Sequence, residues 1–411
     1  MTGRRVVVTG IGIVSPHGSN SDVALDEIFK GKSAVTLVDL PSRSGRFSTP
    51  GAIVPDNPWM QLPRLPFPTC DRVSLLALAA SERAIVDAGL FLENEQPSRI
   101  GIAVGTSMGG TASQEAAYED VFAHGKQRLN PFTLVKVMYN GPAAQIAMRH
   151  RLTGSCLTYS TTCSSSSIAI GEAMRTIRHG YADVVIAGGT EAPFTYVSLI
   201  AWNALHVLAP ANQTDVSSSC RPFSLTRSGT VLGEGAAFLV LEEFERAQRR
   251  GARIYAELAG YGVCNDSGHL TQPSKEGQVK AMSLALEDGG ITPDSIDYVN
   301  AHGTGTRLND ATETAAIKQV FGSHSKILAV SSTKSVHGHL IGAAGALELV
   351  ISVAAIQRNW VPPTAHLDQR DPACDLDFVP NVGKRTNVIA AMSNSFAVGG
   401  TAVALVVRKA I

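Results

Sequence analysis

The chain has 411 residues, more than a single hydrophobic core usually serves, so we expect two core units packed together. Hydrophobic residues make up 44% of the sequence and charged residues 17%, and the 38 glycines favour an α/β protein with many tight turns. The 35 basic and 35 acidic side chains cancel, which argues against nucleic acid or a membrane surface as a partner.

The first half of the chain alternates short apolar runs with helical patterns. Val6–Gly10 predicts a buried strand, and Ile100–Val104 and Asp183–Ala187 predict two more, each followed by glycines. The segments 73–88 and 143–149 have the residue spacing of helices. This alternation predicts a mostly parallel sheet with crossover helices.

A second series of the same kind fills the rest of the chain. It contains the predicted strands Tyr255–Gly260, Ile296–Asn300 and Ile327–Ser331. In each half one strand leads into a polar turn and then a long helix, which predicts a duplicated α/β unit with halves at residues 1–250 and 251–411. Because ligands of open α/β sheets gather at the carboxyl ends of strands, we expect the two turns to meet.

The polar turn of the first half carries a cysteine. Cys163 lies in Ser160–Ser167, directly before the helical pattern Ile168–Ile177, which Gly180 closes. Unpaired N–H groups and the dipole at a helix N-terminus favour a thiolate, so Cys163 is a candidate nucleophile. A buried structural cysteine is the alternative.

A glycine-rich turn in the second half carries the first candidate histidine. His302 is followed by Thr304 and Thr306, whose hydroxyls can bind an amide-bearing ligand arm. The next helix is expected to open at Asp310, with Glu313 three residues on as in a capping box. A surface histidine is the alternative, but a thiol with two such imidazoles is the minimum set for covalent acyl chemistry.

The turn Lys334–His339 carries the second candidate histidine and is followed by small residues that allow close helix packing. A buried lysine needs a carboxylate, for which Glu348 is the candidate; a surface lysine is the alternative. Near the C-terminus, the glycine-rich turn Asn394–Thr401 can aim a backbone N–H at a developing oxyanion.

The six cysteines are scattered and form no C-x-x-C pair, so we expect no metal site and no disulfides, but reduced thiols in the cytoplasm. The N-terminal residues run straight into a strand without the apolar core of a signal peptide. No uninterrupted apolar stretch approaches the roughly 20 residues of a membrane span. The glycine turns fit neither a dinucleotide fingerprint nor a P-loop, so no bound cofactor is expected.

With these motifs the chain resembles a β-ketoacyl-acyl-carrier-protein synthase, of the elongating type with a Cys-His-His active site, within the thiolase superfamily. The resemblance spans the full length and is most specific around Cys163, His302 and His339; Val231–Ala236 and Gly342–Ala346 add to it. It implies a thiolase-like duplicated fold, with two similar halves in a five-layer α/β/α/β/α stack, normally as a dimer.

The resemblance implies a role for each turn. Cys163 would take an acyl chain from the phosphopantetheine of an acyl carrier protein, as a thioester. His302 and His339 would assist decarboxylation of malonyl carrier protein and stabilise the enolate, which attacks that thioester. Lys334, paired with Glu348, would orient and electrostatically support the His339 side of the site.

It also implies binding groups around these residues. The backbone N–H groups of Cys163 and Val398 would form the oxyanion hole for the acyl carbonyl. Thr304 and Thr306 would hold the pantetheine arm.

The sequence departs from the family pattern at the expected acyl pocket. Val398 stands where elongating members typically have a bulky aromatic gate. Thr133 stands where an aromatic often crosses the dimer interface to close the acyl tunnel. Both changes predict a wider or longer pocket, which Met108 and Trp202 are also expected to line; Trp202 acts in the opposite direction.

Two further departures concern proton handling and the carrier protein. His337 replaces a hydroxyl residue two positions before the second catalytic histidine; it either perturbs proton handling or, in our preferred interpretation, is a hydrogen-bonding partner. His206 occupies a position often held by arginine, so the basic patch for the acidic carrier protein is thin. Three candidates remain: Lys126, Arg128 and Arg64.

The sequence therefore predicts a decarboxylative condensing enzyme in a specialised polyene, polyketide or modified fatty-acid pathway. We expect it to bind neither nucleic acid nor a membrane. It would be a homodimer, or a heterodimer with a ketosynthase-like subunit. Housekeeping fatty-acid elongation is one alternative, and a non-catalytic chain-length-factor-type subunit is another, against which Cys163, His302 and His339 argue. A degradative thiolase would need a second reactive cysteine in the C-terminal glycine turn, which has none.

Overall fold

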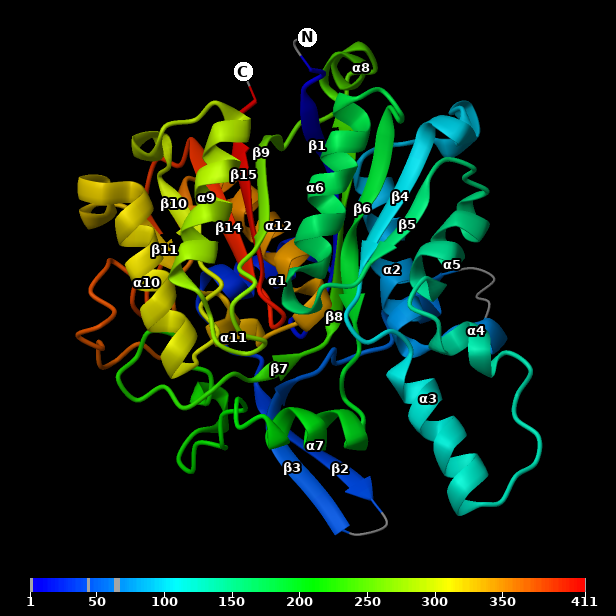
Figure 1. Ribbon diagram of the computed structural model, residues 1–411. Helices are drawn as coiled ribbons and strands as arrows, with labels where there is room; N and C mark the ends of the chain where they lie inside the picture. Colours follow the sequence, from blue (N-terminus) through cyan, green and yellow to red (C-terminus); the bar gives the residue numbers. More distant parts are fainter. Residues whose placement is uncertain (1–2, 43–44, 63–66, 411) are drawn as a thin grey trace.

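A ten-stranded mixed sheet runs through the molecule (Figure 1). The computed structural model describes residues 3–42, 45–62 and 67–410. The strands follow one another in the order β11-β10-β14-β15-β9-β1-β8-β6-β4-β5. Their bounds are Val6–Val14 (β1), Ile100–Gly105 (β4), Cys156–Tyr159 (β5), Val184–Glu191 (β6), Gly235–Glu243 (β8), Ala256–Asn265 (β9), Tyr298–Asn300 (β10), Ala329–Ser331 (β11), Ala390–Phe396 (β14) and Thr401–Arg408 (β15).

The two halves of this sheet have the same topology, which confirms the predicted duplication. Counted outward from the centre, β1-β8-β6-β4-β5 corresponds to β9-β15-β14-β10-β11. β1 and β9 join the halves through two antiparallel residue pairs, Val7 with Glu257 and Val8 with Ala256. The division into units at residues 250 and 251 stays a prediction; it falls in the turn between α8 (Phe244–Arg249) and β9.

Helices form the three other layers of the expected α/β/α/β/α stack (Figure 1). α2 and α5 cover the strands of the first half; α9 covers β9 and β15 of the second half, and α10 packs beside α9. α6 and α12 contact each other and strands of both halves, so they form the middle layer. The bounds are Arg72–Asp87 (α2), Gly141–His150 (α5), Ser165–Arg178 (α6), Lys275–Gly289 (α9), Arg307–Phe321 (α10) and Ala344–Arg358 (α12).

The prediction of a mostly parallel sheet is wrong for its centre. β4 pairs in parallel with β5 and β6, and β10 pairs in parallel with β11 and β14, but every pairing between these outer groups is antiparallel. In each half the last strand, β8 or β15, returns antiparallel between the first strand and its other neighbour. The central strands are buried along nearly all of their length and are mostly apolar, and such a pattern carries no sign of strand direction.

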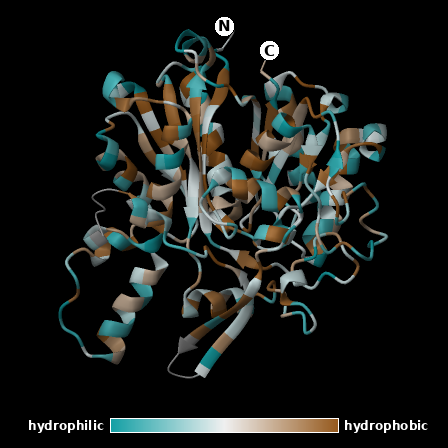
Figure 2. Ribbon diagram, turned by 180° about the vertical axis from the view of Figure 1, so that it is seen from behind, coloured by the Kyte–Doolittle hydropathy of each residue, from teal (hydrophilic) through white to brown (hydrophobic). Residues whose placement is uncertain are grey.

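The remaining elements flank and connect these layers. In Figure 1, α3 and the segment leading to α4 project away from the layers, and β2 and β3 form a second projection. Figure 2 shows that hydrophobic residues concentrate in the central strands, while the outer helices carry many hydrophilic ones. The bounds are Ser21–Phe29 (α1), Thr36–Ser42 (β2), Gly45–Ala52 (β3), Thr111–Tyr118 (α3), Thr133–Val137 (α4), Tyr196–Ala204 (α7), Leu232–Gly233 (β7), Phe244–Arg249 (α8), Lys334–His337 (α11), Trp360–Val361 (β12) and Lys384–Arg385 (β13).

The middle-layer helix α12 is strongly apolar and almost completely buried. Together with the turn before it, Ile341–Arg358 is long and apolar enough to cross a membrane by length and composition, with a mean hydropathy of 1.4. However, 89% of this stretch is buried inside the protein. Its apolar surface is therefore explained by its position between the two halves of the sheet.

Candidate active site

Four turns from distant parts of the chain meet at one edge of the sheet. β10 pairs in parallel register with β11 and β14, so the turns after these strands start from the same edge. These turns carry His302, His339 and Val398. Cys163 follows β5, which is the topological counterpart of β11 in the first half. The predicted meeting of the reactive turns is confirmed.

Cys163 lies at the start of the middle-layer helix α6, in the single 3-10 turn Thr162–Ser164, and is 5% exposed. Thr162 has φ 51°, a left-handed conformation that is uncommon for threonine. Its hydroxyl donates to the carbonyl oxygen of Val398 at 2.8 Å. This bond ties the cysteine turn to the C-terminal glycine turn.

Burial raises the pKa of the Cys163 thiol to about 11, so it outweighs the groups that favour a thiolate in the resting site. The charge of Lys334 and the backbone N–H of Val398 lower this pKa but do not overcome burial. Removing a thiolate from water costs more than these two groups return. Near neutral pH the resting sulfur is therefore a thiol.

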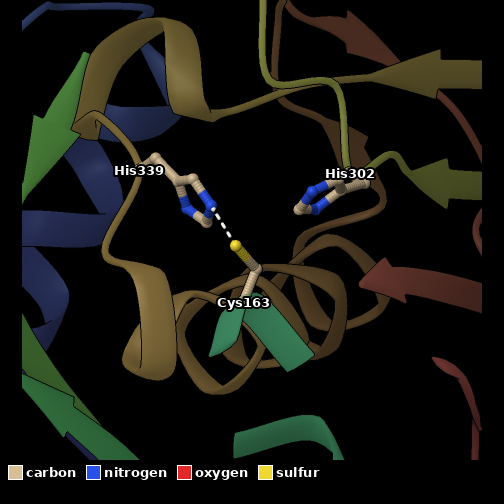
Figure 3. Close-up of side chains that lie close together, drawn as sticks. All are labelled: Cys163, His302 and His339. Carbon is tan, nitrogen blue, oxygen red and sulfur yellow. Dashed lines mark hydrogen bonds between the residues drawn. The ribbon is translucent and has the colours of Figure 1, made fainter. Parts of the chain in front are cut away.

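The His339 ring faces this thiol (Figure 3). Its Nε2 lies 3.0 Å from the Cys163 Sγ, and its Nδ1 accepts a hydrogen bond from the backbone N–H of Ile341 at 3.2 Å. A neutral imidazole that accepts at Nδ1 carries its proton on Nε2. His339 is thus oriented as a hydrogen-bond donor toward the sulfur and the space beside it.

His302 completes the group from the opposite side (Figure 3). The ring centroids of His302 and His339 are 5.5 Å apart, and the planes meet at 84°. The Phe396 ring lies edge-on to His302, with the centroids 5.9 Å apart. Burial, followed by the charge of Lys334, holds the pKa of both histidines well below its usual value. Both imidazoles are therefore neutral at physiological pH.

The helix after His302 does not begin as predicted. α10 begins at Arg307, so Asp310 and Glu313 lie inside it and form no capping box. Instead, Glu313 accepts hydrogen bonds from the backbone N–H of His302 and of Gly303, both at 2.8 Å. The carboxylates bind the turn before the helix, because that turn is folded back over its first turns.

Lys334 and Glu348 form the predicted ion pair, and both side chains are completely buried. Burial raises the pKa of Glu348 to about 7, although Lys334 acts in the opposite direction. The ammonium is close enough to influence the thiol and both catalytic imidazoles electrostatically. The Lys334 ammonium therefore places a positive charge close to the site.

His337 is buried one turn away and uses both ring nitrogens within its own turn. Nδ1 donates to the carbonyl oxygen of Gly338 at 2.7 Å, since a carbonyl can only accept. Nε2 then accepts from the hydroxyl of Thr333 at 3.0 Å. This arrangement supports the interpretation of His337 as a hydrogen-bonding partner that shapes the turn before His339.

A cavity of about 520 Å³ borders the three residues. Thr304 and Thr306 line it, and their hydroxyls lie 2.9 Å apart. Trp202, His206 and Val398 are further parts of its wall. The side chains predicted to bind a pantetheine arm and those predicted to bind an acyl chain therefore share one cavity with the nucleophile.

Cys163 also belongs to an apolar cluster. Met108, Trp202 and Leu199 belong to this cluster together with Cys163. Thr133, by contrast, begins α4 and belongs to neither this cluster nor the described cavity wall. Thr133 therefore does not line the acyl pocket that the described residues of a single chain form, in contrast to the prediction.

Glu191, which sequence analysis missed, is completely buried at the end of β6. Its carboxylate accepts from the backbone N–H groups of Ser107 (2.8 Å), Met108 (3.2 Å) and Gly342 (3.0 Å), and from the hydroxyl of Thr106 (3.2 Å). Burial raises its pKa to about 7. Glu191 links the acyl-pocket turn to the segment after His339. The only feature of the sequence that could have indicated this role is a carboxylate at the end of a predicted buried strand.

The basic residues expected to meet a carrier protein are few and exposed. Lys126 forms an ion pair with Asp120 at 2.6 Å, and Arg128 lies in the same exposed loop. Arg64 lies outside the described residues. Arg307, which the sequence did not single out, is exposed and lines the cavity.

The three reactive side chains also form a possible metal-ligand set. One donor atom each of Cys163, His302 and His339 lies within 4.8 Å of the others. Thiolate sulfur and neutral imidazole nitrogen are ligands that Zn²⁺ accepts. The expectation that the protein uses no metal here stays a prediction.

Known proteins resemble the chain over nearly its whole length. Two family models match, "Beta-ketoacyl synthase, N-terminal domain" over residues 3–247 and "Beta-ketoacyl synthase, C-terminal domain" over residues 255–368. "Nodulation protein E" of Rhizobium meliloti (strain 1021) is 42% identical over 406 residues, covering 99% of both chains. "3-oxoacyl-[acyl-carrier-protein] synthase 2" of Coxiella burnetii is 39% identical over 412 residues, covering 100% of this chain and 99% of that one.

A solved structure has the same fold. "The ishigamide ketosynthase/chain length factor" matches with a TM-score of 0.93 and 31% sequence identity, covering 100% of each chain. This likeness agrees with the five-layer arrangement of the two halves described above.

Proposed function

The chain belongs to the β-ketoacyl synthase family of acyl-transferring condensing enzymes, and we propose that it condenses malonyl carrier protein with an acyl thioester held on Cys163. The observation that carries this proposal is the meeting of Cys163, His302 and His339 beside one cavity. A thiol with two neutral imidazoles suits decarboxylation and carbon–carbon bond formation. A non-catalytic chain-length subunit would have no need of this group.

In the first step, the Cys163 sulfur attacks the thioester carbon of an acyl group on the pantetheine arm. The bond from that carbon to the pantetheine sulfur breaks, and the proton of the Cys163 thiol ends on the departing sulfur. The Nε2–H of His339 supports the developing thiolate, 3.0 Å away. The backbone N–H groups of Cys163 and Val398 are proposed to bind the acyl oxyanion.

In the second step, the malonyl thioester loses CO₂ and the electron pair of the broken bond forms an enolate. His302 and His339, held neutral by burial, donate N–H bonds to the enolate oxygen. The enolate carbon attacks the acyl carbon, the bond to the Cys163 sulfur breaks, and the freed sulfur takes a proton from solvent. The nearby charge of Lys334 favours the anionic state.

Different parts of the site suit the pantetheine arm and the acyl chain. Thr304 and Thr306 offer hydroxyls along its wall, which suits the amides of a phosphopantetheine arm delivered by an acyl carrier protein. The apolar cluster with Met108 and Trp202 suits a hydrocarbon acyl chain. Small Val398 leaves room between the two.

A specialised polyene, polyketide or modified fatty-acid pathway is the proposed setting. Two of the three similar proteins have names that refer to specialised products or processes, nodulation and ishigamide. The Coxiella protein is named for the condensation itself, and housekeeping fatty-acid elongation is the corresponding alternative. A cytoplasmic location is proposed with either setting.

A second ketosynthase-like subunit, a copy or a homologue, is proposed to cover the β5 edge of the sheet. β5 pairs only with β4 among the described strands, and Leu157 on it is 51% exposed. Nearby in the first half, α4 exposes 73% of Leu134. An unpaired apolar edge strand is a ready site for pairing with another chain. That subunit would also be the source of any residue that closes the acyl tunnel.

The test is intact-mass analysis after incubation with malonyl carrier protein and a panel of saturated and polyunsaturated acyl carrier proteins. An acyl adduct on Cys163 together with a β-ketoacyl product is expected, and the preferred acceptor identifies the pathway. His339→Ala should still be acylated but should lose condensation by a factor of about 10² or more. Absence of product from the wild type, alone and with a co-purified homologue, would refute the proposed function.

A further inference from the structure

Gln278 is a buried glutamine in the cavity wall, 2% exposed, that the mechanism above does not use. It lies on α9, on the same helix face as Met282. Its side-chain carbonyl oxygen, Oε1, is buried and has no hydrogen-bond partner. Buried side-chain oxygens are usually paired, so a ligand-binding role is a natural explanation.

The hydrogen bonds around Gln278 fix which way its amide points. The Nδ2 of Asn309 donates to Glu313 at 3.3 Å and to Asp310 at 3.4 Å, and carboxylates only accept. The Asn309 oxygen must therefore face Gln278, and it accepts from the Gln278 Nε2 at 3.3 Å. The amide of Gln278 cannot be flipped without placing two oxygens against each other. Oε1 is left as the free acceptor.

The same chain of bonds ties Gln278 to the catalytic turn. Glu313, which receives the Asn309 donor, also holds the backbone N–H groups of His302 and Gly303. Gln278 is therefore positioned by residues whose other function is to hold the His302 turn. The terminal torsion of a glutamine is broad, so a small rotation can bring Oε1 toward a ligand in the cavity while Nε2 keeps its bond to Asn309.

We propose that the Gln278 Oε1 accepts a hydrogen bond from an amide N–H of the pantetheine arm. This inference rests on the proposed function. Of the groups that enter the cavity, the malonyl carboxylate and a hydrocarbon acyl chain offer no donor, whereas pantetheine offers amide N–H groups. Gln278 also lines the cavity with Thr304 and Thr306, and it is not part of the apolar cluster around Cys163.

The test compares two thioesters of the acyl group that the wild type prefers, one on pantetheine and one on ethanethiol, which has no amide. Gln278→Met keeps the length of the side chain and removes the acceptor. Acylation of Cys163, followed by mass, should give a kcat/KM about tenfold lower than wild type with the pantetheine thioester. With the ethanethiol thioester, the variant and the wild type should react equally. Gln213→Met, at an exposed glutamine outside the cavity wall, is the matched control and should leave both rates unchanged.

Two results would overturn the inference. An equal loss with both thioesters would assign Gln278 a structural role, and no loss with the pantetheine thioester would mean that the oxygen is satisfied without the ligand. A thermal unfolding midpoint of Gln278→Met at or above that of the wild type excludes misfolding as a cause. Failure of the wild type itself to become acylated would refute the proposed function rather than this contact.

Discussion

Lys334 and Glu348 form an ion pair in which neither side chain has any exposure to solvent. Replacing Lys334 with Met leaves a buried carboxylate without its cation, and breaking a buried pair in this way costs about 3–5 kcal/mol. Lys334→Met should therefore lose stability by that amount in urea unfolding.

The double variant Lys334→Met/Glu348→Gln separates stability from electrostatics. It removes both charges and should recover most of the lost stability. Decarboxylation of malonyl carrier protein should stay slow, because the positive charge that favours the enolate is gone. Full recovery of decarboxylation in this variant would show that the lysine acts only by holding the fold.

The raised pKa of Cys163 predicts how its alkylation depends on pH. With a thiol pKa of about 11, the thiolate fraction rises about tenfold for each pH unit between 7 and 10. The rate of carboxamidomethylation of Cys163 by iodoacetamide, followed by peptide mass spectrometry, should rise in the same proportion. A rate that levels off below pH 9 would mean that a thiolate is already stabilised in the resting site.

The small side chain of Val398 predicts a chain-length effect. Val398→Phe adds volume at the cavity wall and should shorten the products or block long acyl acceptors. The product lengths are measured by mass spectrometry of the carrier-bound β-ketoacyl groups. Val382→Phe, at a valine that is 75% exposed, is the matched control. Unchanged product lengths in Val398→Phe would refute the wider-pocket prediction.

Glu191 predicts a stability effect close to the acyl pocket. In Glu191→Gln an NH₂ group faces some of the four donors that the carboxylate now accepts, so these bonds are lost at a cost of about 2–3 kcal/mol. Glu93→Gln, on the exposed surface, should change the free energy of unfolding by less than about 0.5 kcal/mol. Equal urea midpoints for the two variants would contradict the assigned role of Glu191.

The exposed apolar side chains of α4 predict an effect on assembly. Leu134→Glu places a charge where the second subunit is proposed to dock and should weaken the dimer. Sedimentation velocity of the protein, alone or with its homologue, measures this. Leu225→Glu, at another exposed leucine, should leave the assembly unchanged. A monomeric wild type in both settings would argue against the proposed interface.

The sequence by itself determined the elements that depend on local pattern. The strand–turn–helix around Cys163, the turn of His302 and the Lys334–His339 segment could be predicted because glycine, polar and apolar residues alternate there at characteristic spacings. The duplication followed from the strand–turn–helix unit that appears in each half, and the meeting of the turns followed from the rule that ligand sites form at the carboxyl ends of strands. The buried partner of Lys334 could be inferred because an unpaired buried ammonium is too costly.

Only the tertiary structure decided the features that depend on distant groups. The antiparallel centre of the sheet was missed because buried apolar strands carry no sign of direction. The start of α10 was missed because the carboxylates of this helix bind a turn that is folded back over it. The pKa of Cys163 depends on how completely water is excluded. The tautomer of His339 depends on the backbone N–H of Ile341, and the free oxygen of Gln278 on hydrogen bonds from another helix. Solvation and hydrogen bonding are set by neighbours in space, which a linear sequence does not specify.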